Sequence, residues 1–87
     1  MKKMTTVAIL ALTWILWAKD VTSDGRTVWR SEKSFQMQLD CEDWAVDWVD
    51  VLMDKHTGWK RIDSVSFSHP DGQSYFKCFP ETFNPRS

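Results

Sequence analysis

The clearest pattern of hydrophobic and polar positions lies in the middle of the chain, between Ser34 and His56. Apolar side chains recur there at the three- and four-residue intervals that place them on one face of a helix. These positions are Cys41, Trp44, Ala45, Trp48 and Leu52. Lys55 and His56 suit the last turn, where cations interact favourably with the helix dipole, and Gly58 follows as a terminator. The pattern predicts one amphipathic helix from Ser34 to about His56.

Two runs of strand-forming residues precede this helix. Trp14–Val21 and Thr27–Arg30 are rich in tryptophan and β-branched residues, and Ser23-Asp24-Gly25 lies between them. Asp-Gly between two such runs is a strong local signal for a β-hairpin. The N-terminal part of the domain is therefore predicted to be two antiparallel strands.

A second pair of strands is predicted after the helix. Arg61–Ser68 alternates between apolar and polar residues, which is typical of a half-buried strand. The sequence 69–72 (His-Pro-Asp-Gly) has the chemistry of a tight turn. Ser74–Phe79 is the predicted return strand, and the period of two places Phe76 and Cys78 on the same face.

The elements follow the order β-β-α-β-β. The simplest packing is an α+β fold in which a small antiparallel sheet carries the helix on one face. Cys41 lies in the first helical turns and Cys78 on the helix-facing side of the last strand, so the two can meet. They are the only cysteines in the chain, and we expect them to form one disulfide.

The N-terminus has the features of an export leader. Met1-Lys2-Lys3 is positively charged, and Met4–Ala18 is uncharged and largely apolar. Lys19 ends the run short of the roughly 20 apolar residues that a membrane-spanning helix needs. We therefore expect a signal peptide or a short signal anchor that ends at Thr13 or at Ala18.

The two possible ends of the leader have different consequences for the fold. Cleavage after Ala18 would destroy the first predicted strand, so we favour a leader of residues 1–13, with 1–18 as the alternative, and a single domain of residues 14–87. The predicted location is the periplasm or the exterior of the cell, where disulfides persist. If the leader is not cleaved, it would anchor the protein in the inner membrane.

Composition narrows the class of protein. The 87 residues include eleven basic and twelve acidic side chains, a net charge of −1, which argues against a nucleic-acid-binding protein. Apolar residues make up 43 % and six are tryptophans, so a packed core is expected rather than disorder. Without the leader about 70 residues remain, near the lower limit for a self-sufficient core. A disulfide closing a loop of about 38 residues would contribute about 4 kcal/mol in the chain-entropy model.

Several short pieces of the chain form a recognisable set. They are Trp14–Trp17, Thr27–Trp29, Phe35 with Asp40-Cys41, and Cys78–Glu81 with Asn84–Arg86. This set resembles a group of short proteobacterial exported proteins with a W-V-L-W-type strand, an F-x-x-x-x-D/E-C helix start and a C-x-P-E-x-x-N-P-R tail. Met37 stands where that group has a capping serine or threonine, and Asn84 where aspartate is usual. The resemblance implies a paired-cysteine exported domain and brings no activity with it.

Catalytic, metal and cofactor chemistry find no support in the residue pattern. His56 ends the predicted helix and His69 precedes a proline in a turn, so neither has an obvious partner for acid–base or nucleophilic catalysis. The two distant cysteines lack the spacing of a zinc, redox or haem-attachment motif. Asp40, Glu42 and Asp43 lack the glycine-containing loop of a calcium site. We predict no catalytic, metal or cofactor-binding residue.

Two features remain as a candidate interaction surface. One is a row of aspartates on a single helical face: Asp43, Asp47, Asp50 and Asp54. Such a row is usually a solvated surface, and its functional reading is a docking face for a basic protein partner. The other is Trp59, which follows Gly58 on a connecting segment and would mark an interface if it is exposed.

These observations predict a small exported, non-catalytic binding or structural module. One alternative is a membrane-tethered accessory protein with an uncleaved leader. Another is a small enzyme, which requires a concave pocket that brings His56 or His69 together with a carboxylate. The expected partner is a protein, with no nucleic acid and with membrane contact only through the leader. Self-association is also open to the chain if the first and last strands are free sheet edges.

Overall fold

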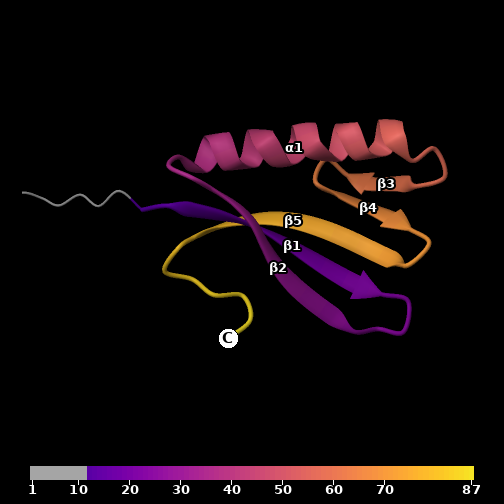
Figure 1. Ribbon diagram of the computed structural model, residues 1–87, viewed down its shortest axis with the longest axis horizontal. Helices are drawn as coiled ribbons and strands as arrows, with labels where there is room; N and C mark the ends of the chain where they lie inside the picture. Colours follow the sequence, from indigo (N-terminus) through magenta and orange to yellow (C-terminus); the bar gives the residue numbers. More distant parts are fainter. Residues whose placement is uncertain (1–11) are drawn as a thin grey trace, which may run out of the picture.

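The computed structural model describes residues 12–87 and has an α+β fold (Figure 1). Within these residues the chain forms one helix and five antiparallel strands, joined by a disulfide. The elements are β1 (Trp14–Thr22), β2 (Thr27–Phe35), α1 (Gln38–Lys55), β3 (Lys60–Asp63), β4 (Ser66–His69) and β5 (Gly72–Pro80). The α+β class, the antiparallel sheet, the single helix and the disulfide are as predicted.

The strands lie in the order β2-β1-β5-β4-β3. β1 is an interior strand: it pairs with β2 on one side and with β5 on the other, from Trp14 opposite Pro80 to Thr22 opposite Gly72. The first and last strands are therefore neighbours inside the sheet, and the expectation that they form its free edges is wrong. The edges are β2, with nine residues, and β3, with four.

The predicted strand Arg61–Ser68 is two strands, β3 and β4, joined by a tight turn. Asp63 makes this turn, because its Oδ1 accepts hydrogen bonds from the Val65 amide (2.9 Å) and the Ser66 hydroxyl (2.6 Å). These two hydrogen bonds lower the pKa of Asp63 below its ordinary value of 3.8. Ser66 is fully buried, although the alternation of residues placed it on the solvent face.

The helix begins later than predicted, because β2 continues to Phe35. Met37 is the N-cap residue and provides no side-chain hydrogen bond to the first turn of α1. The fully buried positions of α1 are Cys41 and Val49, with Ala45 almost so. The predicted apolar positions at 44, 48 and 52 are half-buried at the margin of the core. The helix covers one face of the sheet (Figure 1).

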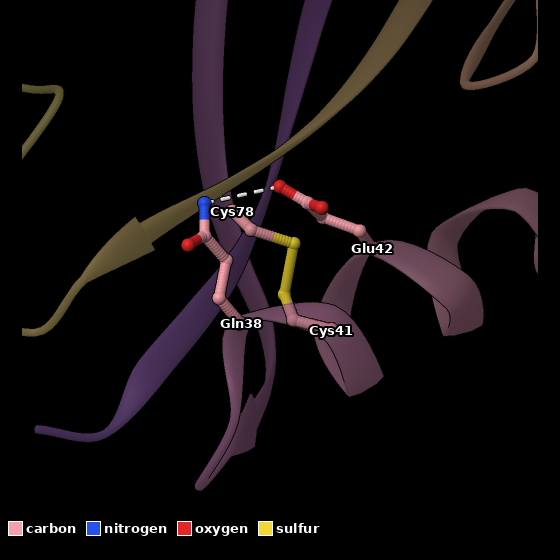
Figure 2. The surroundings of a disulfide bond; sticks show 4 residues. All are labelled: Gln38, Cys41, Glu42 and Cys78. Atoms are coloured by element: carbon pink, nitrogen blue, oxygen red, sulfur yellow. Dashed lines mark hydrogen bonds between the residues drawn. A yellow bond between two sulfur atoms is a disulfide. The ribbon is translucent and has the colours of Figure 1, made fainter. Parts of the chain in front are cut away.

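The disulfide joins α1 to β5. Cys41 and Cys78 are bonded, with a Cα–Cα distance of 6.2 Å and a sequence separation of 37. Figure 2 shows Cys41 bonded to Cys78 of β5, beside a hydrogen bond from the Gln38 amide to the Glu42 carboxylate (3.1 Å) one helical turn away. The predicted connection between the helix start and the last strand is confirmed.

The opposite face of the sheet is covered in part by the C-terminal segment, which turns back toward β2 (Figure 1). Glu81 begins this segment: its carboxylate accepts a hydrogen bond from the Thr13 amide (2.7 Å), and its own amide donates to the Thr13 carbonyl (2.8 Å). Arg86 lies over the Trp17 ring at 5.1 Å and donates two hydrogen bonds to the Trp29 carbonyl. We call residues 81–87 the tail.

The position of β1 bears on the end of the leader. Leu16 and Ala18 are fully buried in this interior strand, so a chain cut after Ala18 would lose half of the strand that holds β2 and β5 together. Most of the predicted leader, residues 1–13, lies outside the described residues. Among residues 12–87, no helix is both long enough and apolar enough to cross a membrane.

Candidate functional site

The residues predicted as an interaction surface are only partly free. Asp43, Asp47, Asp50 and Asp54 are all exposed on α1. The Asp50 carboxylate forms an ion pair with Arg61 of β3. A docking face for a basic protein remains a prediction for these aspartates.

Trp59 is half-buried and packs against the core. Its ring stacks with His56 (3.7 Å between ring centres) and with Phe67 (5.1 Å). Trp59 therefore forms part of an aromatic stack between the end of α1 and the sheet.

A cleft of about 500 Å³ opens where the C-terminal half of α1 meets the sheet. Its apolar wall comes from both layers: Trp48, Leu52, Trp59, Phe67 and Phe76. Its polar rim is built by β1, β2 and the β4–β5 hairpin, and its main groups are Asp20, Arg30, Glu32, His69, Asp71 and Ser74. Small-molecule sites commonly combine such an apolar wall with a few fixed polar groups, and they have volumes of this order.

Four of the rim residues form a hydrogen-bonded chain that crosses four strands. His69 Nε2 of β4 lies 3.0 Å from the Ser74 hydroxyl of β5. The Ser74 hydroxyl donates to Asp20 Oδ1 of β1 (2.8 Å). Arg30 Nε of β2 donates to Asp20 Oδ2 (2.8 Å). We call these four residues the polar chain.

The direction of the hydrogen bonds follows from the backbone. His69 Nδ1 accepts a hydrogen bond from the Asp71 amide (3.3 Å), so the imidazole proton is on Nε2. His69 therefore donates to Ser74, and the Ser74 proton is directed to Asp20. In this arrangement the histidine orients the hydroxyl and does not act as its base.

The electrostatics of the polar chain centre on Asp20. Partial burial alone would raise the pKa of Asp20, but the hydrogen bonds from Arg30 and Ser74 and the charge of Arg30 outweigh it and lower the pKa below 3.8. The Asp20 carboxylate in turn raises the pKa of Arg30. Arg30 also pairs with Glu32. The carboxylate and the guanidinium therefore stay charged and fixed in place.

A second hollow of about 400 Å³ lies beside the disulfide. Glu42 and Lys77 are its charged lining residues, and Cys78 forms part of its wall. None of the hydrogen bonds found in residues 12–87 links those two charged groups across it. The cleft with the polar chain is therefore the better candidate site.

The polar chain was not predictable from the residue pattern. His69 has the sequence context of a turn residue, and nothing in the pattern gives Asp20, Arg30 or Ser74 a role. The one usable signal was the hairpin register: an Asp-Gly turn at 24–25 places Asp20 near Arg30 on the paired strand. Within residues 12–87, no group of three or more histidine, cysteine, aspartate or glutamate side chains is arranged to hold a metal ion.

Comparisons with known proteins give no further guide. No protein-family model matches the chain, and neither a curated protein nor a solved structure shows significant similarity to it. Any function must therefore be argued from the site itself.

Proposed function

We propose that this protein is a small exported binding module that takes a small molecule into the cleft between α1 and the sheet, without catalysis. The observation that carries the proposal is the polar chain at the rim of an apolar cleft. Its four side chains come from four strands and hold one another in place. Such a site has its polar groups oriented before the ligand arrives, which lowers the entropic cost of binding.

The state of Ser74 supports the non-catalytic part of this proposal. A nucleophilic serine needs a base that accepts its proton and an exposed oxygen. Here the Asp71 amide occupies Nδ1 of His69, which leaves Nε2 as the donor to Ser74, and the carboxylate of Asp20 accepts the Ser74 proton. Ser74 is also only 6 % exposed. The cleft does bring His69 together with carboxylates, as the small-enzyme alternative requires, but the direction of these hydrogen bonds and the burial of Ser74 support a binding role.

Export is supported by the disulfide. Structural disulfides persist in oxidising compartments and are rare in the cytosol. The Cys41–Cys78 bond joins the helix to the centre of the sheet, so the domain depends on a compartment in which that bond can form. N-terminal sequencing of protein from the cell envelope tests this part of the proposal, and we expect a mature chain that begins at or before Trp14. A start after Ala18, or an uncleaved Met1 in the membrane fraction, contradicts it.

Binding in the cleft can be measured by NMR of the tryptophan indole groups with 2-phenylethanol as a neutral probe. We expect concentration-dependent shifts of the Trp48 and Trp59 indoles, which line the cleft. Trp29, on the opposite face of the sheet beside Lys19 and the tail, serves as the internal control. Equal shifts of all indoles, or none at millimolar probe, would contradict a specific site.

A variant of the polar chain sharpens this test. Ser74→Ala removes the hydroxyl that links His69 to Asp20, and we expect weaker binding of the probe with an unchanged far-ultraviolet circular dichroism spectrum. Ser31→Ala, on an exposed position of β2, is the matched control and should bind as the wild type does. If the two variants bind equally well, the polar chain plays no part in recognition.

A further inference from the structure

The charges at the rim of the cleft are unequal. Asp20, Glu32 and Asp71 contribute three negative charges, and Arg30 contributes one positive charge. These four formal charges sum to two negative units. The apolar wall behind it has a low dielectric constant, which strengthens the attraction of this rim for a cation.

The guanidinium of Arg30 is already paired with two carboxylates of the protein. Its Nε donates to Asp20 Oδ2 at 2.8 Å, and its Nη1 pairs with Glu32. A carboxylate or phosphate ligand would have to compete with two fixed carboxylates for the same guanidinium. The rim is therefore unfavourable for anions, although it contains an arginine.

Asp71 differs from the other two carboxylates. Its backbone is fixed on both sides, because the Ser23 amide donates to its carbonyl (3.0 Å) and its own amide donates to His69 (3.3 Å). Within residues 12–87, no hydrogen bond or ion pair to its carboxylate is found. Asp71 is thus a positioned negative charge at the rim that a ligand can neutralise.

We propose that the cleft selects ligands that carry a protonated amine on an apolar body. This inference rests on the proposed binding function and specifies its ligand class. An ammonium group has three N–H donors and suits a rim in which carboxylates come from β1, β2 and the β4–β5 hairpin. The apolar body would lie against Trp48, Leu52 and Phe76.

Three probes of similar size and different charge test the class. They are 2-phenylethylamine, 2-phenylethanol and 3-phenylpropanoate, each titrated against the oxidised full domain at neutral pH and followed through the Trp48 and Trp59 indoles. We expect the amine to bind up to about fivefold more tightly than the alcohol, since one exposed ion pair contributes up to about 1 kcal/mol. The anion should bind most weakly.

The outcomes separate this inference from the proposed function. If the alcohol or the anion binds as tightly as the amine, the ligand class is wrong and the binding site stands. If none of the probes shifts the cleft indoles, both fail. A preference for the amine that disappears at high salt while the alcohol is unaffected supports the electrostatic origin.

Removing the charge of one carboxylate tests whether Asp71 binds the ammonium group. Asp71→Asn keeps the size of the side chain and should weaken the amine about fivefold while leaving the alcohol unchanged. Asp43→Asn, on the exposed side of α1 away from the cleft, is the control and should change neither. If Asp71→Asn leaves amine binding intact, or weakens both probes equally, the rim carboxylate does not select the ligand and the inference is overturned.

Discussion

The two faces of the sheet bury their residues by different means. Leu16 and Trp17 are neighbours on β1 and point to opposite faces, and they are 0 % and 8 % exposed. Leu16 packs in the core with Ala45 and Val49 of α1, which the disulfide fastens to the sheet. Trp17 lies beneath the Arg86 guanidinium of the tail. The two residues are similarly buried, but different groups cover them. On the helix-covered face these are apolar side chains held by the disulfide, and on the tail-covered face a guanidinium contributes.

The tail-covered face has further contacts between a cation and aromatic rings. The Lys19 ammonium lies between the rings of Trp29 (5.8 Å) and Tyr75 (5.7 Å). The indole N–H of Trp17 is buried without a hydrogen-bond partner among the described residues, which costs stability. We infer that the helix-covered face supplies most of the stability and that the tail-covered face tolerates change.

The largest expected effect comes from removing the disulfide. The Cys41→Ala/Cys78→Ala variant should lose about 4 kcal/mol of unfolding free energy, because the unfolded chain regains the entropy of the closed loop. Urea unfolding with and without reductant measures this. Reductant should destabilise the wild type and leave the double variant unchanged. A loss below about 1 kcal/mol would mean that apolar packing alone holds the helix.

Truncating the core beneath the helix should have the next largest effect. Leu16→Ala leaves a cavity among fully buried neighbours, and we expect a loss of about 3 kcal/mol within the usual range of about 2–5. Val28→Ala on β2, where the side chain is 48 % exposed, is the control and should stay within about 0.5 kcal/mol of wild type. Equal losses for the two variants would contradict the placement of the core.

On the tail-covered face, Arg86→Ala should cost about 1 kcal/mol, the usual scale of a cation–aromatic contact. The same change should shift the Trp17 emission to longer wavelength as the ring becomes exposed. Arg86→Lys keeps the cation but has one nitrogen where Arg86 uses two on the Trp29 carbonyl, so it should recover part of the loss. If Arg86→Ala destabilises the domain as much as Leu16→Ala, the proposed difference between the faces is wrong.

Much of the helix-covered face was predictable from sequence, because its signals are local or covalent. The helical period from Cys41 to Leu52 and the Asp-Gly hairpin each depend on residues close together in the chain. The disulfide followed from there being two cysteines. The turn at Asp63 was missed because a side-chain hydrogen bond interrupts what otherwise alternates like a single strand.

The candidate site was missed for a different reason. Asp20 and Ser74 are 54 residues apart and meet only because β1 pairs with β5 in one register. No local sequence pattern predicts the pairing register of β1 with β5, because that register depends on which face of each strand the helix covers. The contacts of the tail, such as Arg86 with Trp29, are also long-range and follow no period.

The smallest expected effect is a pH dependence that marks the polar end of the helix-covered face. Hydrogen bonds hold the pKa of Asp20 below 3.8 in the folded state, whereas the unfolded chain has the ordinary value. The stabilisation that the charged Asp20 carboxylate provides is therefore complete above the unfolded pKa of 3.8. It is lost as the pH falls through the lower folded pKa. Asp20→Asn removes it, so the wild type and the variant should differ in stability most near neutral pH and converge in acid.

Urea midpoints measured from about pH 7 to about pH 2 test this, with Asp43→Asn as the control. A gap that stays constant over that range would show that charge on Asp20 is not what orders the cleft rim, and the carboxylate would then act only through its shape.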